Sequence, residues 1–207
     1  SIPAFWVESS CLDECEVSRS VEDGTLVSIL INNYNYGQFL GEAIDSALQQ
    51  TYSHTEIVVV DDGSTDNSRE VIASYGDQII PVLKKNGGQA SAFNAGFAAS
   101  HGDMICFLDS DDLFMPDKVT EVRAVMQSHP DVGWCFHRLK HIDMGTGVLL
   151  RVSPGVPSGL YDFTSSLNDH RRASLPLSGP ATCGLCFSRS LLEQILPMPE
   201  AEGVTIS

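Results

Sequence analysis

The hydrophobic positions between residues 26 and 137 fall into two alternating patterns. Leu26–Ile31 is a short β-rich run, and Ile57–Val60 is a continuous apolar run of the kind expected for a strand that is covered on both faces. Between them, apolar residues recur at the three- and four-residue spacing of an amphipathic helix, as at Leu40, Ala43 and Ile44. This alternation predicts an α/β fold of Rossmann-like build, with a mostly parallel central sheet flanked by helices.

The boundaries of the predicted elements follow from capping and turn residues. The predicted strands are 26–31, 56–60, 79–83, 104–108 and 132–137, and the predicted helices are 39–48, 65–75, 89–99 and 116–129. Thr65 or Asp66 is a suitable N-cap for the second helix, and Pro116 is suited to the first position of the fourth. Beyond residue 140 glycines and prolines predict a loop-rich stretch that holds a hairpin, followed by a strand at 182–187 and a helix at 190–195. Residues 1–24 show no sustained period, and we expect them to form a tail or an arm.

The charge balance narrows the classes of partner. Lys and Arg total 12 against 27 Asp and Glu, which gives a formal net charge of −15. A nucleic-acid binder needs a basic surface, and so does a protein that rests on anionic lipid, so we expect neither. No apolar run approaches the length of a membrane span, and residues 1–24 lack the pattern of a signal peptide. These features favour a cytoplasmic setting with no evident membrane association, and they do not indicate an oligomeric state.

Cysteine spacing offers a metal site as an alternative that we do not favour. Cys183 and Cys186 have the spacing of a metal clip, and Cys11 with Cys15 would supply a second pair. However, no His-x-x-x-His accompanies them, and Cys186 lies in an apolar run typical of a strand. Ordinary reduced cysteines are therefore the favoured interpretation.

Polar clusters follow each of the first four predicted strands. They are Asn32–Asn35, Asp61 with Asp62, Asn86–Gly88, and Asp109–Asp112. In an open parallel sheet, ligands bind outside the carboxyl ends of the strands, where these four clusters would lie together. The acidic cluster at Asp109–Asp112 is flanked by apolar sequence on both sides, so it is expected to need a positive partner rather than to be an ordinary solvated loop.

Several familiar nucleotide and metal motifs are absent. No Gly-x-Gly-x-x-Gly follows the first strand, and there is no Gly-x-x-x-x-Gly-Lys phosphate loop. Counted from Asp109, an EF-hand fails because Leu113 and Phe114 occupy the positions of a ligand and a required glycine. The remaining hypothesis is a hard divalent cation, Mg²⁺ or Mn²⁺, held by one or two carboxylates and completed by substrate phosphates.

Taken together, the motifs resemble those of the family-2 glycosyltransferases, which have the GT-A fold. The matching segments are Val27–Asn35, Gln50–Tyr52, Glu56–Asp66, Asn94–Gly96, Phe107–Asp112 and Pro116–Lys118. They cover about residues 26 to 137 in the order and spacing of that family. The resemblance implies transfer of a sugar from a nucleotide-diphosphate sugar to a saccharide or other hydroxyl acceptor, metal-dependent and commonly with inversion.

The resemblance also implies roles for single residues. Asn32 would line the nucleotide base, Asp62 would accept a hydrogen bond from the base ring, and Gly87 and Gly88 would let the backbone approach the ribose. Asp109-Ser110-Asp111 matches the Asp-x-Asp motif of the family. The full predicted nucleotide site is Asn32, Tyr34, Asp61, Asp62, Gly87, Gly88, Asp109, Ser110 and Asp111, and the predicted metal ligands are Asp111 and Asp112.

On this resemblance residues 25–140 form the donor-binding subdomain and residues 141–207 begin an acceptor-side region that is incomplete. The general base of an inverting family member follows the Asp-x-Asp motif at some distance, and we expect it beyond Ser207, in a chain that is truncated. Two alternatives stay open. One is a non-catalytic module that binds a sugar nucleotide, and the other is a nucleotidyltransferase, although Asn32–Tyr36 lacks the Arg- and Lys-bearing loop that such enzymes usually carry.

Overall fold

The computed structural model describes residues 3–7, 24–137, 139–142, 146, 148–152, 159–162 and 182–200. Its strands are β1 (Pro3–Val7), β2 (Val27–Asn33), β3 (Thr55–Asp62), β4 (Ile80–Lys84), β5 (Met104–Asp109), β6 (Trp134–His137), β7 (Lys140–Ile142), β8 (Leu149–Val152), β9 (Gly159–Asp162) and β10 (Leu185–Ser188). Its α-helices are α1 (Gly37–Leu48), α2 (Ser68–Ser74), α3 (Gly88–Ala99), α4 (Lys118–Ser128) and α6 (Arg189–Ile195), with 3₁₀ turns η2 (Gly76–Gln78) and η3 (Thr182–Gly184).

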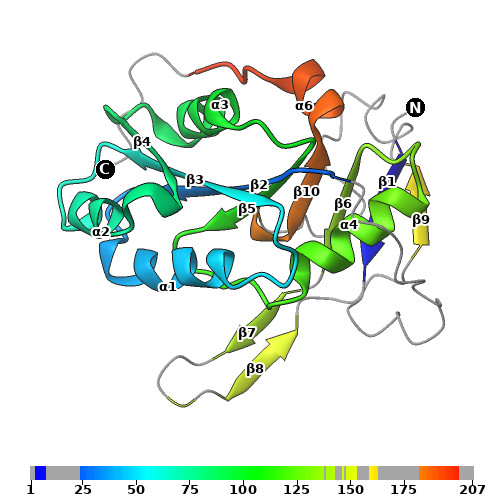
Figure 1. Cartoon of the computed structure of the whole chain (residues 1–207), viewed down its shortest axis with the longest axis horizontal. Helices are drawn as coiled ribbons and strands as arrows, with labels where there is room; N and C mark the ends of the chain where they lie inside the picture. The colour runs from blue at the N-terminus through cyan, green and yellow to red at the C-terminus, as the bar shows by residue number, and fades with distance from the viewer. Residues whose placement is uncertain are drawn as a thin grey trace, which may run out of the picture.

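A central sheet of eight strands in the order β4-β3-β2-β5-β10-β6-β1-β9 organises the described residues (Figure 1). The strands β4, β3, β2 and β5 are parallel neighbours, whereas β10 runs antiparallel to both β5 and β6. The predicted α/β fold with a mostly parallel sheet flanked by helices is confirmed. Because β10 comes from the C-terminal part of the chain, the sheet continues across the boundary expected at residue 140.

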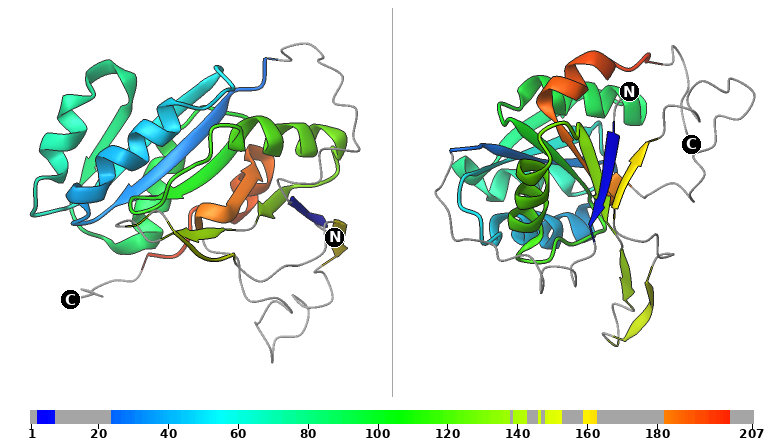
Figure 2. Two further views of the ribbon diagram at one scale, coloured as in Figure 1. Left: turned by 90° about the horizontal axis from the view of Figure 1, so that it is seen from below. Right: turned by 90° about the vertical axis from the view of Figure 1, so that its right-hand side faces the viewer.

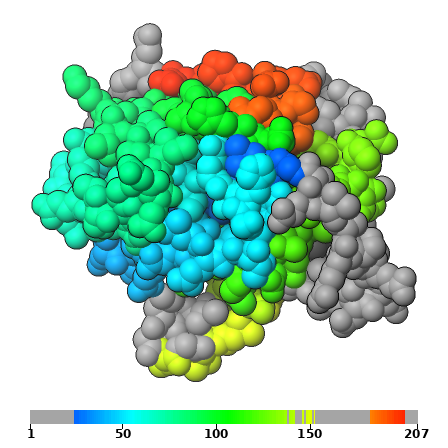
Figure 3. All heavy atoms as spheres, viewed as in Figure 1, coloured from blue at the N-terminus to red at the C-terminus, as the bar shows by residue number. Residues whose placement is uncertain are grey.

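Helices cover both faces of this sheet, as the continuous apolar runs predicted. The helices α1, α2 and α4 lie on one face, and α3 and α6 lie side by side on the other (Figures 1, 2 and 3). Alternate residues of β2 point to opposite faces of the sheet: Ile29 and Ile31 pack toward α1, whereas Leu30 packs toward α3. Burial of both faces is what fixes the register of these strands.

A small antiparallel hairpin, formed by β7 and β8, projects away from the body of the sheet (Figures 1 and 2). It lies in the stretch for which glycines and prolines predicted a hairpin. No helix among the described ranges combines the length and the apolar character needed to cross a membrane.

Three local expectations differ from the structure. The helix α2 begins at Ser68, with Asn67 in the N-cap position. The side chain that bonds its first N–H group is nevertheless that of Asp66, which accepts from the backbone N–H groups of Ser68, at 3.0 Å, and of Gly37, at 2.9 Å. Asp66 therefore joins the starts of α1 and α2. The helix α4 begins at Lys118 rather than at Pro116. Finally, β1 is a strand within residues 1–24, where the sequence shows no periodic pattern.

Gly96 marks the closest approach of α3 to the sheet, and it provides a test of the packing. A Cβ atom at Gly96 would overlap Leu30 Cδ2 and lie 3.0 Å from Val60 Cγ2, whereas a Cβ atom at Gly41 in α1 would make ordinary contacts of 3.6 Å and longer. We expect Gly96→Ala to lower the free energy of unfolding by about 1–3 kcal/mol through overpacking. Gly41→Ala should raise it by up to about 1 kcal/mol, because alanine is the better helix former. Urea unfolding of both variants measures the difference, and a stable Gly96→Ala protein would contradict the packing described.

Candidate functional site

The carboxyl ends of β2, β3 and β5 bring the predicted site residues to one edge of the sheet. Parallel pairing sets Asn33 opposite Asp61 on one side of β2 and Asn32 opposite Asp109 on the other. The hydroxyl group of Ser110 donates to the backbone carbonyl of Asn32, which ties the acidic loop to the end of β2. The Oδ1 atom of Asn32 is a buried acceptor without a hydrogen-bond partner in the structure, so a ligand with a donor group would be favoured at this edge.

Asp61 is completely buried, and its carboxylate is engaged by the protein itself. It accepts hydrogen bonds from Arg69 Nε at 2.8 Å, from Asn33 Nδ2 at 3.2 Å and from the backbone N–H of Ser64 at 3.3 Å. Arg69 also donates to the carbonyl of Lys84 at 3.2 Å. In this structure Asp61 therefore organises the ends of β3 and β4, and it has no exposed atom for the ligand contact predicted from the sequence.

Asp62 is held at the start of α3 by three donors. Its Oδ1 atom accepts from Lys84 Nζ at 2.5 Å and from the backbone N–H of Gly87 at 3.0 Å, and its Oδ2 atom accepts from the N–H of Gly88 at 2.8 Å. Gly88 has a φ angle of +81°, a left-handed conformation that glycine adopts without strain. The two glycines therefore bring backbone donors close to Asp62 at the expected nucleotide site.

The loop after β2 presents two aromatic rings at the same edge. Asn35 has a φ angle of +59°, and it is bonded to the loop after β3 through its N–H to Ser64 Oγ at 2.9 Å and through its Oδ1 to the N–H of Thr65 at 2.8 Å. Tyr34 and Tyr36, on either side of it, are 42% and 44% exposed. The loop is thus fixed by its asparagine while its tyrosine rings remain accessible.

Asp109, Asp112 and Cys183 form a group of potential metal ligands. One ligand atom of each lies within 4.8 Å of the others, and within the described residues this is the one such group of three. Burial, and then the negative charges of Asp112 and Asp111, raises the pKa of Asp109 to about 6. Burial and a hydrogen bond to Asp112 raise the pKa of the Cys183 thiol. The cluster thus carries negative charge that the protein does not fully compensate.

The chemistry of this group fits a divalent cation. Carboxylates are the ligands that Mg²⁺ and Mn²⁺ prefer, whereas a thiol suits softer ions. Of the two predicted ligands, Asp112 belongs to the group, while Asp111 is exposed and lies outside it. Cys183 was missed as a neighbour of this site, because it comes from the distant turn η3 and no spacing in the sequence links it to the acidic loop.

Cys186, in contrast, lies in the core with a buried lysine. Lys118 is 6% exposed, and its Nζ atom donates to Cys186 Sγ at 2.9 Å. Burial alone would raise the pKa of Cys186, but its hydrogen bonds with the Cys106 and Cys135 thiols, and the Lys118 charge, hold that pKa well below its ordinary value. Cys183 and Cys186 therefore face different partners and do not form a joint metal clip. Cys11 and Cys15 lie outside the described residues.

The Asn94-Ala-Gly96 segment has a structural role on α3. Asn94 Oδ1 accepts from the N–H of Met198 at 2.8 Å, and its Nδ2 donates to the Met198 carbonyl at 3.0 Å and to Glu200 Oε1 at 3.1 Å. Asn94 therefore fastens the chain that follows α6 onto the outer face of α3.

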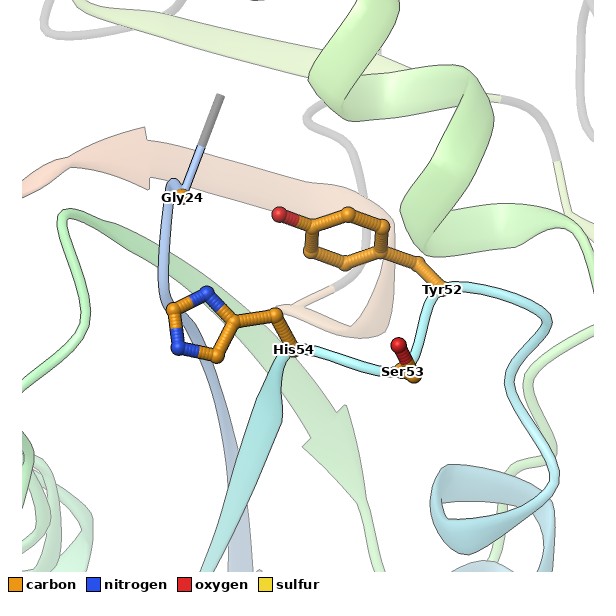
Figure 4. Close-up of a pocket in the computed structure, with 4 residues that line it drawn as sticks. All are labelled: Gly24, Tyr52, Ser53 and His54. Atoms are coloured by element: carbon orange, nitrogen blue, oxygen red, sulfur yellow. The ribbon is translucent and has the colours of Figure 1, made fainter. Parts of the chain in front are cut away.

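A separate pocket of roughly 350 Å³ lies at the opposite edge of the sheet (Figure 4). It is lined by Gly24, Tyr52, Ser53 and His54, which precede β2 and β3 rather than follow them. This pocket therefore lies at the amino ends of the strands, whereas the acidic cluster lies at their carboxyl ends.

Comparison with known proteins agrees with the resemblance drawn from the motifs. Residues 28–196 match the family model described as Glycosyl transferase family 2. An uncharacterised glycosyltransferase of Nostoc sp. is 41% identical over 176 residues, which is 83% of this chain and 53% of that protein. The glycosyltransferase GlyG of Streptococcus pneumoniae is 38% identical over 112 residues, covering 52% of this chain and 37% of that protein. The chain thus spans about half the length of the first of these relatives, and less of the second.

Two solved structures share the fold. TarS of S. aureus in complex with UDP superposes with a TM-score of 0.58 at 21% identity, covering 81% of this chain and 48% of TarS. The mannosyltransferase PcManGT of Pyrobaculum calidifontis, in complex with GDP-Man and Mn²⁺, superposes with a TM-score of 0.55 at 22% identity, covering 84% of this chain and 47% of that one.

The raised pKa of Asp109 predicts that this carboxylate destabilises the metal-free protein. A carboxyl whose pKa is raised on folding, from 3.8 to about 6, binds its proton more tightly in the folded state. Stability is then lost as the pH rises through that interval, and the loss is complete near neutral pH. Asp109→Asn should therefore unfold at higher urea concentration than the parent near pH 7 in the presence of a chelator, by on the order of 1 kcal/mol because the group is partly solvated.

The advantage of Asp109→Asn should disappear at a pH below 3.8, where the parent carboxyl is protonated in both states. Asp77→Asn, an exposed acid in η2 before β4, serves as the control and should change stability little at any pH. An Asp109→Asn protein that is less stable than the parent near neutral pH would show that the cluster is not electrostatically strained.

Proposed function

Because the chain belongs to glycosyl transferase family 2, we propose that it forms the donor-binding side of an enzyme that transfers a sugar from a nucleotide-diphosphate sugar to an acceptor hydroxyl. The reaction would break the bond between the anomeric carbon and the diphosphate and form a bond to the acceptor oxygen, whose proton passes to a general base. The nucleoside diphosphate is the leaving group. We propose metal dependence and inversion at the anomeric carbon as the finer description, together with a saccharide or other hydroxyl compound as acceptor.

The observation that carries this proposal is the arrangement at the carboxyl edge of the sheet. Asp62 at the end of β3 and the group of Asp109 and Asp112 at the end of β5, joined by Cys183 of η3, lie on either side of β2, at the edge where an open parallel sheet binds its ligands. A carboxylate at one side suits the N–H groups of a base, and a cation-binding group at the other suits a diphosphate.

The roles of single residues follow from this arrangement. We propose that Asp62 accepts a hydrogen bond from the base, with Asn32 and Tyr34 beside it. Asp109 and Asp112 would hold Mn²⁺ or Mg²⁺, and Asp111, which is exposed at the same turn, would contact the ribose or the diphosphate. The ion would neutralise charge that develops on the leaving diphosphate. The Mn²⁺ and GDP-Man bound to PcManGT support this assignment by likeness of fold.

Isothermal titration calorimetry with UDP-, GDP- and dTDP-sugars in Mn²⁺ or Mg²⁺ tests the proposal. We expect at least one of these sugar nucleotides to bind, and we expect Asp112→Asn to weaken its metal-dependent binding at least tenfold, about 1.4 kcal/mol or more, because an anionic ligand to the metal is lost. Asp77→Asn, the exposed acid at the other edge, is the matched control and should bind like the parent.

The possible results separate the alternatives. Absence of binding for all three sugar nucleotides would overturn the proposal, and equal binding by Asp112→Asn and the parent in Mn²⁺ would overturn the metal assignment. Binding without transfer or donor hydrolysis in the full-length protein would favour a non-catalytic module.

A further inference from the structure

The Asp62 carboxylate is nearly enclosed, and the protein already occupies most of its acceptor positions. Asp62 is 4% exposed. Its Oδ1 atom has two donors, Lys84 Nζ at 2.5 Å and the N–H of Gly87 at 3.0 Å, while its Oδ2 atom has one, the N–H of Gly88 at 2.8 Å. A carboxylate offers about four lone-pair sites, so the contacts of the described residues leave a single site, and it is on Oδ2.

The three donors are held by the fold rather than by flexible side chains alone. Lys84 is the register partner of Asp62 on β4, and its backbone carbonyl is fixed by Arg69 at 3.2 Å. Gly87 and Gly88 donate from the first turn of α3, and a side chain at Gly87 would lie 2.9 Å from Ser91 Cβ and 3.0 Å from Lys84 Nζ. The fold therefore fixes which lone pairs of Asp62 are occupied, and a ligand can donate a hydrogen bond only to the remaining lone pair of Oδ2.

The common nucleobases differ in what they present to such an acceptor. Uracil and thymine offer one ring N–H between two carbonyl groups, which matches one lone pair. Guanine offers two adjacent donors, its ring N–H and its amino group, which together need both oxygens of a carboxylate. Adenine and cytosine present an unprotonated ring nitrogen at that position, and a carboxylate repels it. A site with one free lone pair leaves a guanine donor unpaired, which costs binding.

We infer that Asp62, with one of its oxygens occupied by Lys84, selects a uridine or thymidine diphosphate sugar and rejects a guanosine diphosphate sugar. This inference rests on the proposed function, because it assumes that Asp62 faces the base. Lys84 is then a specificity-determining residue that acts through Asp62. The sequence does not reveal this role, because Lys84 and Lys85 are consecutive lysines at the end of β4 and no pattern shows which of them contacts Asp62.

The first experiment uses the unmodified chain and needs no variant. Titration with UDP, dTDP, GDP, CDP and ADP in Mn²⁺, without the sugar, isolates the contribution of the base. We expect UDP and dTDP to bind at least tenfold more tightly than GDP, and CDP and ADP to bind no better than GDP. GDP binding equal to or tighter than UDP would overturn the inference while leaving the proposed function intact, whereas absence of binding for every nucleotide would overturn the proposed function itself.

The second experiment changes the number of free lone pairs. Lys84→Met removes the donor to Oδ1, so both oxygens of Asp62 can accept from guanine, and the ratio of UDP to GDP affinity should fall at least threefold. The ratio is the readout, because loss of the Lys84 charge weakens the binding of every diphosphate alike. Lys85→Met removes the neighbouring exposed lysine, whose side chain makes no described contact with Asp62, and it should leave the ratio unchanged.

Circular dichroism of both variants establishes that they are folded. An unchanged UDP to GDP ratio in folded Lys84→Met, or an equal fall in Lys85→Met, would show that Lys84 does not set the specificity. If Lys84→Met does not fold, the ranking of nucleotides on the unmodified chain still decides the inference.

Discussion

Parallel pairing of β2 with β3 on one side and β5 on the other is the constraint on which the rest of the structure depends. It sets the ends of the three strands level, so that Asp61 and Asp109 fall opposite neighbouring asparagines of β2. A slip of one residue would turn Asp61 and Asp62 to the wrong faces of the sheet, and it would also expose the apolar residues that β2 and β3 bury against α1 and α3. The same strand register is therefore needed both to pack the core and to place the carboxylates.

The acidic residues at this edge differ in how their charge is compensated. Asp61 and Asp62 lie against Arg69 and Lys84 and accept several backbone N–H groups, so the protein supplies the counter-charge that burial demands. No Arg or Lys among the described residues forms an ion pair with Asp109 or Asp112, and burial, followed by the charges of Asp112 and Asp111, raises the pKa of Asp109. Asp61 and Asp62, whose charges are compensated, shape the site, whereas the group that contains Asp109 and Asp112 is suited to bind a cation.

The sequence predicted most of the fold, because burial on both faces leaves a continuous apolar signal at β2, β3 and β5 that few other structures share. It predicted the edge of the sheet at which the acidic clusters gather for the same reason. It did not reveal β1, which lies in a segment without period, nor the start of α2, where Asp66 bonds both to Ser68 of its own helix and to Gly37 of α1. Roles that depend on contacts between distant segments stayed hidden. Cys183 lies beside the acidic loop although it comes from η3. The sequence likewise does not show that Arg69 donates a hydrogen bond to the Asp61 carboxylate.

Lys118 lies in the core and connects the two segments on either side of the acidic turn at Asp109–Asp112. Its ammonium group, buried against Cys186 Sγ at 2.9 Å and over the ring of Phe114, joins the start of α4 to β10 directly after the acidic turn. Burial of the Lys118 ammonium with its sulfur partner contributes little net stability, because desolvation offsets the attraction, but removal of that partner would leave an unpaired charge in the core. Such a pair therefore specifies geometry more than it stabilises. Here it fixes the two segments that flank the acidic turn, α4 on one side and the strand after Cys183 on the other, so the core brings Asp112 and Cys183 together and the hydrogen bond between them adds to this.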